Sequence, residues 1–179
     1  IVTRSGPTGS VAALRRVSAH RAKSAIVLAH CTHSATPETK LASDARVIKT
    51  VLALESLLSS EQEFSIVAEA FTDRNRTVLK DIAPGKVSAV DVEEILAKIM
   101  VQTSRTSGLA VVYSELLGFS GCEMYFHQNP AWSGLQFDRL QYHFADGIPI
   151  GIRPKDGEIL IRPPAEATLG AEDGNIIIR

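Results

Sequence analysis

The chain has 179 residues, of which 45% are hydrophobic and 22% charged, so it contains enough apolar material for one large domain, or for one domain with a small appendage. A formal net charge of −1 without any basic run argues against a broad nucleic-acid-binding surface. Two cysteines indicate a reducing compartment rather than a disulfide framework, and no stretch approaches the roughly 18–20 apolar residues of a membrane span.

Both ends of the chain are apolar. It begins with Ile1-Val2-Thr3 and no methionine, and it ends with Ile176-Ile177-Ile178-Arg179. Natural termini are usually polar and frayed. We therefore expect a segment of a longer protein, and the lack of a membrane span within the segment says nothing about the parent.

The first elements alternate between strand-like and helix-like stretches. Residues 1–3 are predicted as the tail of a strand, and a turn rich in Gly and Pro follows at 6–9. Ser10 is suited to cap a helix over residues 11–22. The continuous apolar run 25–29 is typical of a parallel strand that is buried on both faces.

The next segment is polar and contains a proline. We predict a loop over residues 30–41 because of Pro37, and then a helix that Ser43 caps and that carries apolar residues from 47 to 58. Asp44 would favour the dipole at the start of this helix. A strand is predicted over residues 64–70.

A turn at 73–75, a short helix over 76–82 and a strand over 86–90 complete the alternation. Strands that alternate with helices in this way predict a parallel sheet with crossover helices.

Two consecutive helices follow. Asp91 and Glu94 have the spacing of a capping box and open an amphipathic helix over 92–103. Ser107-Gly108 interrupts it, and a second helix runs over 109–117. A helix pair of this kind is suited to holding a partner subunit, although both helices could instead cover one face of the sheet. The residues expected at a subunit interface are Ile95, Ile99, Met100, Val112 and Leu116.

The character of the sequence changes after Gly118. Short β runs separated by Gly, Pro and Asp predict a small β-rich lobe over 119–179, after a first domain over 1–118 that includes the helix pair. The predicted strands of the lobe are 123–126, 148–152, 159–161 and 176–178, with a turn or short helix beginning at Gly134.

No glycine fingerprint for dinucleotide phosphates is present. The nearest candidate, Gly6-Pro7-Thr8-Gly9-Ser10, has the wrong spacing, and Pro7 lacks an N–H. We interpret it as a turn that can still line a ligand crevice, because loops at the carboxyl ends of parallel strands do so. The same geometry, with Asp44 as a possible ligand contact, gives the candidate ligand-binding residues Arg4, Ser5, His30, Asp44 and Glu69, together with Ala29.

Metal binding and catalysis have weaker support. His30-Cys31-Thr32-His33 could form a metal cluster with Cys122 and His127, but a polar loop after a strand explains the segment as well, and we predict no metal site. Glu69 at a strand end is suited to a salt bridge, a cation or a ligand. No nucleophile elbow, catalytic triad or pair of carboxylates can be recognised, so no catalytic residue is assigned.

Several short segments share their order and spacing with a known family. They are Arg4-Ser5-Gly6, Ser43-Asp44-Ala45-Arg46, Gly108-Leu109-Ala110-Val111-Val112-Tyr113, Leu116-Leu117-Gly118-Phe119, Gly134-Leu135-Gln136-Phe137 and Phe144-Ala145-Asp146-Gly147-Ile148-Pro149-Ile150-Gly151-Ile152. Through these segments the chain resembles the CASTOR and POLLUX ion-channel family over nearly its whole length.

The resemblance implies a cytosolic domain similar to those that regulate potassium conductance (RCK domains) and to TrkA-type subunits. It implies a tetrameric cation channel whose domains form a gating ring that calcium or a nucleotide would switch, with the helix pair exchanged between neighbouring subunits. The isolated segment would then be a soluble homo-oligomer, a dimer, from the cytoplasmic face of a membrane protein. The glycine loop and the acidic ribose-binding residue would precede Ile1, so dinucleotide binding transfers to no residue here.

The expected fold class is therefore α/β, a partial Rossmann-like doubly wound parallel sheet with a helix-turn-helix crossover and then a small β-rich α+β lobe. The expected function is ligand sensing and gating of a potassium-type cation channel, without enzymatic activity. Two alternatives remain open, a fragment of a nucleotide-dependent oxidoreductase and an oligomerisation module that binds no ligand.

Overall fold

The computed structural model describes residues 3–58, 64–118, 121–155 and 158–179. The chain forms two compact units, residues 1–98 and 99–179, with the division inside a helix. The predicted boundary between residues 118 and 119 remains a prediction. Within the described ranges, every helix is too short or too polar to cross a membrane.

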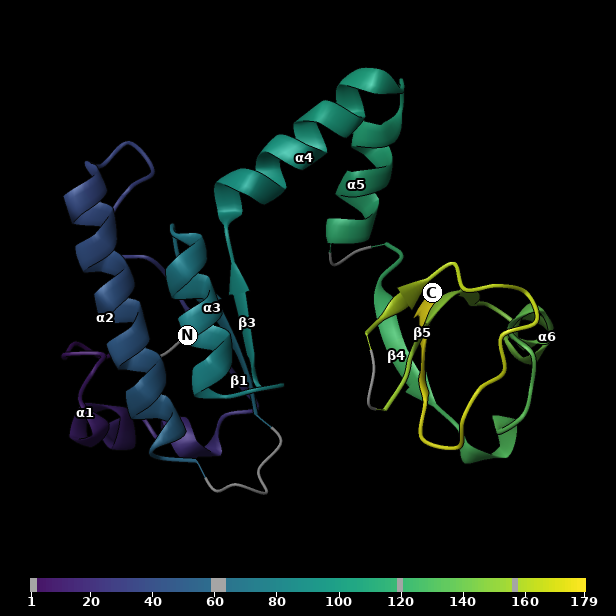
Figure 1. Cartoon of the computed structure of the whole chain (residues 1–179), viewed down its shortest axis with the longest axis horizontal. Coiled ribbons are helices and arrows are strands. Elements are labelled where there is room, and N and C mark those ends of the chain that lie inside the picture. Colours follow the sequence, from purple (N-terminus) through teal and green to yellow (C-terminus); the bar gives the residue numbers. More distant parts are fainter. Residues whose placement is uncertain (1–2, 59–63, 119–120, 156–157) are drawn as a thin grey trace. The chain divides into compact units, whose positions relative to one another are not determined.

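The first unit contains a parallel sheet of three strands in sequential order, β1 (Ser24–Val27), β2 (Ser65–Glu69) and β3 (Val87–Val90). Helix α2 (Pro37–Glu55) connects the first two strands, and helix α3 (Asp73–Ile82) connects the second and third. Both helices lie on the same side of the sheet (Figure 1). The predicted alternation and the parallel pairing are confirmed.

The core of this unit lies between the sheet and its two helices. Ile66 and Ala68 of β2 and Val47 and Val51 of α2 are fully buried. The opposite face of β1 is open, since Ile26 is 73% and Leu28 65% exposed. The prediction that this strand is buried on both faces is therefore wrong for the described chain, in which helices cover one face only. An apolar groove of about 590 Å³ is lined by residues of β1, α1 and α2 among other segments.

The start of α2 corrects the prediction of a loop over residues 30–41. The hydroxyl of Thr36 accepts a hydrogen bond from the Thr39 N–H at 3.4 Å, and Pro37 is the first helical residue. Proline suits this position because the first N–H groups of a helix have no intrahelical acceptor. A hydrogen bond from its own backbone N–H, followed by one from Thr36, lowers the pKa of Glu38 in the first turn. Ser43 is consequently a mid-helix residue rather than the cap.

Two other helices differ from their predicted bounds. Helix α1 (Val11–Arg16) is capped by Ser10 as predicted, but it ends early because Ser18 takes a left-handed φ of 56°, and a 3-10 turn (Ala19–Arg21) follows. Helix α3 begins at Asp73 instead of residue 76, because the Thr72 hydroxyl caps it. Thr3 is not in a strand, and residues 1 and 2 of the predicted strand lie outside the described residues.

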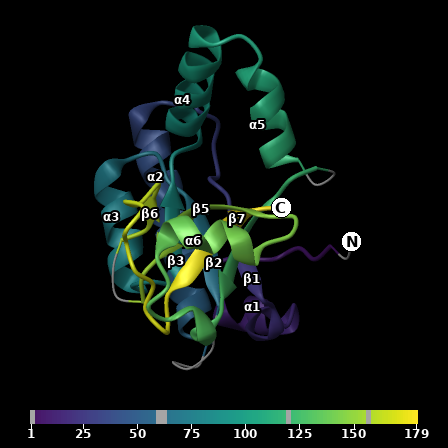
Figure 2. The same cartoon turned by 90° about the vertical axis from the view of Figure 1, so that its right-hand side faces the viewer.

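The predicted helix pair forms two helices, α4 (Val92–Arg105) and α5 (Leu109–Leu117), which a short turn joins (Figure 2). Gly108 permits this turn, since its φ is 90°, a conformation that favours glycine. Asp91 caps α4 by accepting a hydrogen bond from the Glu94 N–H at 3.1 Å. The Glu94 side chain pairs with Lys98 rather than reaching back, so half of the predicted capping box forms.

The second unit contains an antiparallel sheet in the order β4-β7-β5-β6, as expected of a β-rich lobe. Its small core is formed by Leu140, Ile152 and Leu169, with Trp132 and Phe144 packed against them. The strands are β4 (Met124–Gln128), β5 (Ile148–Arg153), β6 (Leu160–Ile161) and β7 (Gly174–Ile178), and the short helices are α6 (Phe137–Leu140) and the 3-10 turns Pro130–Trp132 and Gln141–His143.

Candidate functional site

A pocket of about 520 Å³ lies beyond the carboxyl end of β1. Its walls are the loop 6–10, His30 after the strand, and Arg46 and Lys49 on α2. Ligands of open α/β sheets bind outside the carboxyl ends of the strands, so the pocket occupies the expected position for a ligand.

Two buried hydroxyls of α2 hold the walls in place. Ser43, 3% exposed, accepts a hydrogen bond from the His30 N–H at 2.8 Å. Thr50, 4% exposed, has its Oγ1 3.0 Å from that of Thr8 in the loop. The pocket is therefore built on one helix, which positions the backbone on both sides of it.

The charges that line the pocket are basic. Arg46 and Lys49 are exposed, His30 adds an imidazole, and no carboxylate is among the lining residues that the structure describes. Neither Arg46 nor Lys49 forms an ion pair with any residue that the structure describes. The pocket therefore has an uncompensated positive charge.

Asp44 is close in sequence to Arg46 of this pocket, but it does not line the pocket. Its side chain is fully buried against the loop between β2 and α3. It accepts hydrogen bonds from the N–H of Phe71 at 2.9 Å and from the N–H and hydroxyl of Thr72 at 3.1 and 3.0 Å. The Asn75 side chain donates a fourth bond at 2.8 Å. The prediction that Asp44 favours the dipole at the start of its helix is wrong, because Asp44 lies within α2. There it holds the loop between β2 and α3. Its contact with a ligand remains a prediction.

Glu69 ends β2 and connects three segments. Its Oε2 accepts a hydrogen bond from the Ala29 N–H at 2.9 Å, and its Oε1 lies 3.5 Å from Nε2 of His33. Nδ1 of His33 lies 3.1 Å from Oε1 of Glu93, close enough for an ion pair but without hydrogen-bond alignment. Over the described ranges no three His, Cys, Asp or Glu side chains are arranged to hold a metal.

The two remaining candidates precede the pocket. Arg4 and Ser5 are exposed, and Arg4 Nη1 donates to the neighbouring Thr3 carbonyl at 2.9 Å. The structure thus places His30 in the pocket, whereas Arg4 and Ser5 precede the loop 6–10 and do not line the pocket. Sequence reasoning missed Arg46 and Lys49, although the spacing of Ser43, Arg46 and Thr50 on one helical face was available.

Comparison with known proteins identifies the family. Residues 93–179 match the family described as "Castor and Pollux, part of voltage-gated ion channel". The probable ion channel CASTOR of rice (Oryza sativa subsp. japonica) is 30% identical over 180 aligned residues, which cover 99% of this chain and 19% of that protein. Residues 93–179 thus place this part of the chain in the Castor and Pollux family.

The chain spans about a fifth of the length of its Castor and Pollux relatives. Among solved structures, the human SLO3 gating ring aligns with 98% of this chain and 36% of its own, at a TM-score of 0.68 and 16% identity, a likeness of fold. The GsuK RCK domain covers 97% of this chain and 34% of its own at 20% identity, with a TM-score of 0.39. The curated relatives are named as ion channels or probable ion channels.

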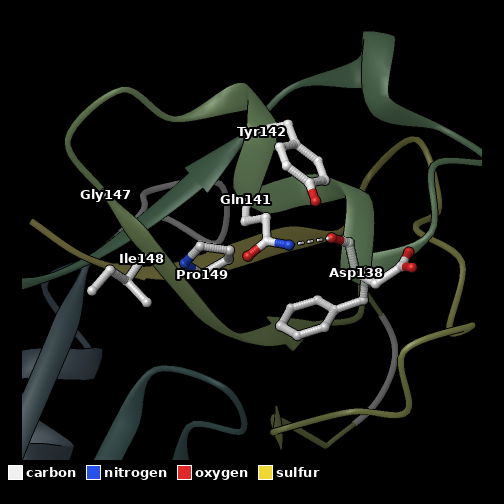
Figure 3. Close-up of a pocket in the computed structure, with 7 residues that line it drawn as sticks. Asp138, Gln141, Tyr142, Gly147, Ile148 and Pro149 are labelled. Carbon is white, nitrogen blue, oxygen red and sulfur yellow. Dashed lines mark hydrogen bonds between the residues drawn. The ribbon is translucent and has the colours of Figure 1, made fainter.

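The Castor and Pollux segment contains a second cavity, of about 410 Å³ (Figure 3). Its wall is apolar and aromatic, formed by Phe137, Tyr142, Ile148 and Pro149. Among the described lining residues, Asp138 carries the one charge. The Gln141 amide donates to the Asp138 carbonyl at 3.1 Å, as the dashed line in Figure 3 marks. With a single carboxylate beside Arg139, this cavity lacks the concentrated charge of the first pocket.

Proposed function

We propose that the chain is part of the ligand-sensing regulatory domain of a cation channel, and that it acts by assembling with copies of itself through α4 and α5. The observation that carries the proposal is that neither of these fully described helices contains a buried residue. This apolar helix pair belongs to a chain that aligns over 99% of its length with a protein named as an ion channel.

The exposed side chains form a stripe at helical spacing. Ile95 is 47%, Leu96 55% and Met100 63% exposed on α4, and Val112 is 48% exposed on α5. The other two predicted interface residues, Ile99 and Leu116, are half-buried. Exposed apolar surface of this kind marks an interaction site, because its burial removes it from water.

The occupant we propose is a second copy of the chain. Support comes from the fold, since the human SLO3 structure that resembles it is named a gating ring. The isolated chain is then a dimer, and the parent protein is a tetrameric channel, conducting potassium-type cations, with this domain on its cytoplasmic face.

A ligand would act through the assembly. If the pocket beyond β1 binds its ligand more tightly in one arrangement of the subunits, the ligand shifts the equilibrium toward that arrangement. Helix α2 provides Arg46 and Lys49 on one side of the pocket, and His30 lies on another side. On the loop that follows His30, Nδ1 of His33 lies 3.1 Å from Glu93 in the first turn of α4. The pocket and the proposed interface helix are thus connected within the first unit.

Light scattering coupled to gel filtration tests the assembly. Met100→Asp and Val112→Asp place a charge on the stripe and should each convert a dimer into a monomer, since a buried unpaired charge is costly. Ser104→Asp and Ser114→Asp add the same charge at exposed polar positions of the same helices and should leave the dimer intact. A monomeric parent chain, or a dimer that survives both apolar substitutions, would contradict the proposed interface.

Channel regulation needs a separate measurement. The chain can replace the matching segment of the rice CASTOR protein, and potassium currents can be recorded in planar bilayers. We expect the chimera to conduct, Met100→Asp to change its open probability, and Ser104→Asp to leave it unchanged. Equal open probability in all three would refute a regulatory role for the helix pair.

Of the two alternatives, the oxidoreductase fragment has no support from the names of the relatives. The module without a ligand predicts that assembly occurs and that the pocket binds nothing. Calorimetric titration of the chain with calcium and with nucleotides separates this alternative from the proposed sensor, because only the sensor predicts heat of binding.

A further inference from the structure

The cavity of about 410 Å³ in the second unit lies between two segments that main-chain hydrogen bonds hold in place. On one side, the N–H groups of Phe137 and Asp138 donate to carbonyls of the segment 165–167 at 2.8 and 3.1 Å. On the other side, Ile148 and Pro149 belong to β5 and pair with β7. The walls are therefore part of the folded unit, as is usual for small-molecule sites.

Two large side chains of this cavity are open to water. Tyr142 is 74% and Ile148 67% exposed. Contact with the apolar body of a ligand would remove this surface from water, which is favourable in proportion to the area buried. The cavity therefore favours a ligand with an apolar body.

The polar groups at the cavity are suited to accept hydrogen bonds. The Asp138 carboxylate offers two acceptor oxygens. Gln141 uses an amide hydrogen on the Asp138 carbonyl, and Figure 3 shows its side-chain oxygen turned away from that bond. Pro149 adds no donor, because its nitrogen carries no hydrogen. A ligand that donates hydrogen bonds is therefore favoured over one that accepts them.

The charge of the described lining residues is negative, since Asp138 is the charged residue among them. Arg139, which does not line the cavity, lies 3.7 Å from the Asp138 carboxylate, but both side chains are exposed and such a pair is worth little. The faces of the Phe137 and Tyr142 rings also attract cations. A cation is therefore attracted to the cavity, and an anion is repelled.

We propose that this cavity binds a small protonated amine with an apolar body. Asp138 accepts hydrogen bonds from the ammonium group, and Phe137 and Tyr142 contact the body. One carboxylate is too few for calcium, which takes roughly six to eight oxygen ligands. The inference goes beyond the proposed sensing function and does not depend on it, because no residue of the pocket beyond β1 takes part.

Three probes with one aromatic body and different charges test the proposal. The isotopically labelled 179-residue chain is titrated at low ionic strength with phenethylammonium, phenethyl alcohol and phenylacetate, and amide shifts are followed by NMR. We expect saturable shifts at Phe137, Gln141 and Tyr142 with the cation. The neutral alcohol should bind about tenfold more weakly, because it cannot form the charge-assisted bond, and phenylacetate should not bind.

Substitutions locate the binding. Asp138→Asn should weaken binding of the cation about tenfold and change that of the alcohol less than about twofold, because only the charge is removed. Glu158→Gln removes the same charge from an exposed position outside the cavity and should change both affinities less than about twofold. Tyr142→Ala should weaken both ligands, and Tyr142→Phe should restore them because the ring remains. Circular dichroism checks that the variants are folded.

Three results would overturn the inference: no saturable shift with the cation, equal affinity for the cation and the alcohol, or equal weakening by Asp138→Asn and Glu158→Gln. The Met100→Asp variant should bind the amine as the unmodified chain does. Failure of the proposed dimer interface would therefore leave this result unchanged, and failure of amine binding would leave the dimer interface unchanged.

Discussion

Thr8 donates its hydroxyl proton to Oγ1 of Thr50 across 3.0 Å. The direction follows from a second bond, since Thr50 uses its only hydroxyl proton on the Arg46 carbonyl at 2.9 Å. The buried Thr50 hydroxyl thus joins the loop that precedes α1 to the turn of α2 that carries Arg46, through one hydrogen bond to each.

Thr50→Val should loosen this loop while it preserves the shape of the core. Loss of one hydrogen bond worth about 1 kcal/mol should speed amide exchange at Thr8 and Gly9 roughly fivefold. Hydrogen exchange followed by NMR measures this. Thr77→Val removes a comparable bond to the Asp73 carbonyl on exposed α3 and should leave the loop amides unchanged. Equal exchange rates in Thr50→Val and the unmodified chain would show that the bond does not hold the loop.

Asp44→Ala should be strongly destabilising. It leaves the partly buried N–H groups of Phe71 and Thr72 and the Asn75 amide without their acceptor, the fully buried Asp44 carboxylate. We expect the free energy of unfolding to fall by about 3–5 kcal/mol in urea titrations, the cost of breaking a buried charged network. Asp81→Ala on the exposed surface of α3 should change it by less than about 0.5 kcal/mol. A similarly small change for Asp44→Ala would remove its structural role.

Tyr125 gives a pH-dependent signal in the second unit. A hydrogen bond to Glu123 at 2.8 Å, and then the negative charge of that residue, raise the pKa of Tyr125 above its ordinary value of 10.0. Since the folded pKa is the higher one, this contribution to stability is complete below the unfolded pKa and is lost as the pH rises through the folded pKa.

Absorbance at an ultraviolet wavelength selective for tyrosinate can follow Tyr125 alone after Tyr113→Phe and Tyr142→Phe. Glu123→Gln should lower the pKa of Tyr125 toward its ordinary value, because the neutral amide removes the charge. Glu115→Gln is the charge-matched control. An unchanged midpoint after Glu123→Gln would mean that the pair does not form in solution.

Gly108→Ala should destabilise the turn between α4 and α5. A residue with a Cβ at a φ of 90° is strained by about 1 kcal/mol. Thermal unfolding should therefore begin earlier than in Ser107→Ala, which changes a neighbouring residue without positive φ. If alanine is tolerated without loss at position 108, the left-handed turn is not required.

The alternation of strands and helices was predictable because each element carries its own apolar period. The wrong predictions concern helix starts, which depend on capping by single residues. Pro37 by itself predicts a loop, although Thr36 before it supplies the cap that makes proline suitable as a first helical residue. The pocket beyond β1 is only partly predictable because Arg46 and Lys49 resemble ordinary surface cations in the sequence, and only the fold of α2 places them opposite the loop 6–10.

The open edge of β1 has a practical consequence for handling the protein. Among the residues that the structure describes, no strand pairs with the outer edge of β1, so the main-chain groups beside Ile26 are a template for any extended segment that reaches them. At high concentration, strand-to-strand aggregation will compete with association through the helices. A dilution series that starts from freshly filtered protein will therefore report a different particle size from a sample stored concentrated, and a lysine placed at position 26 should reduce that difference.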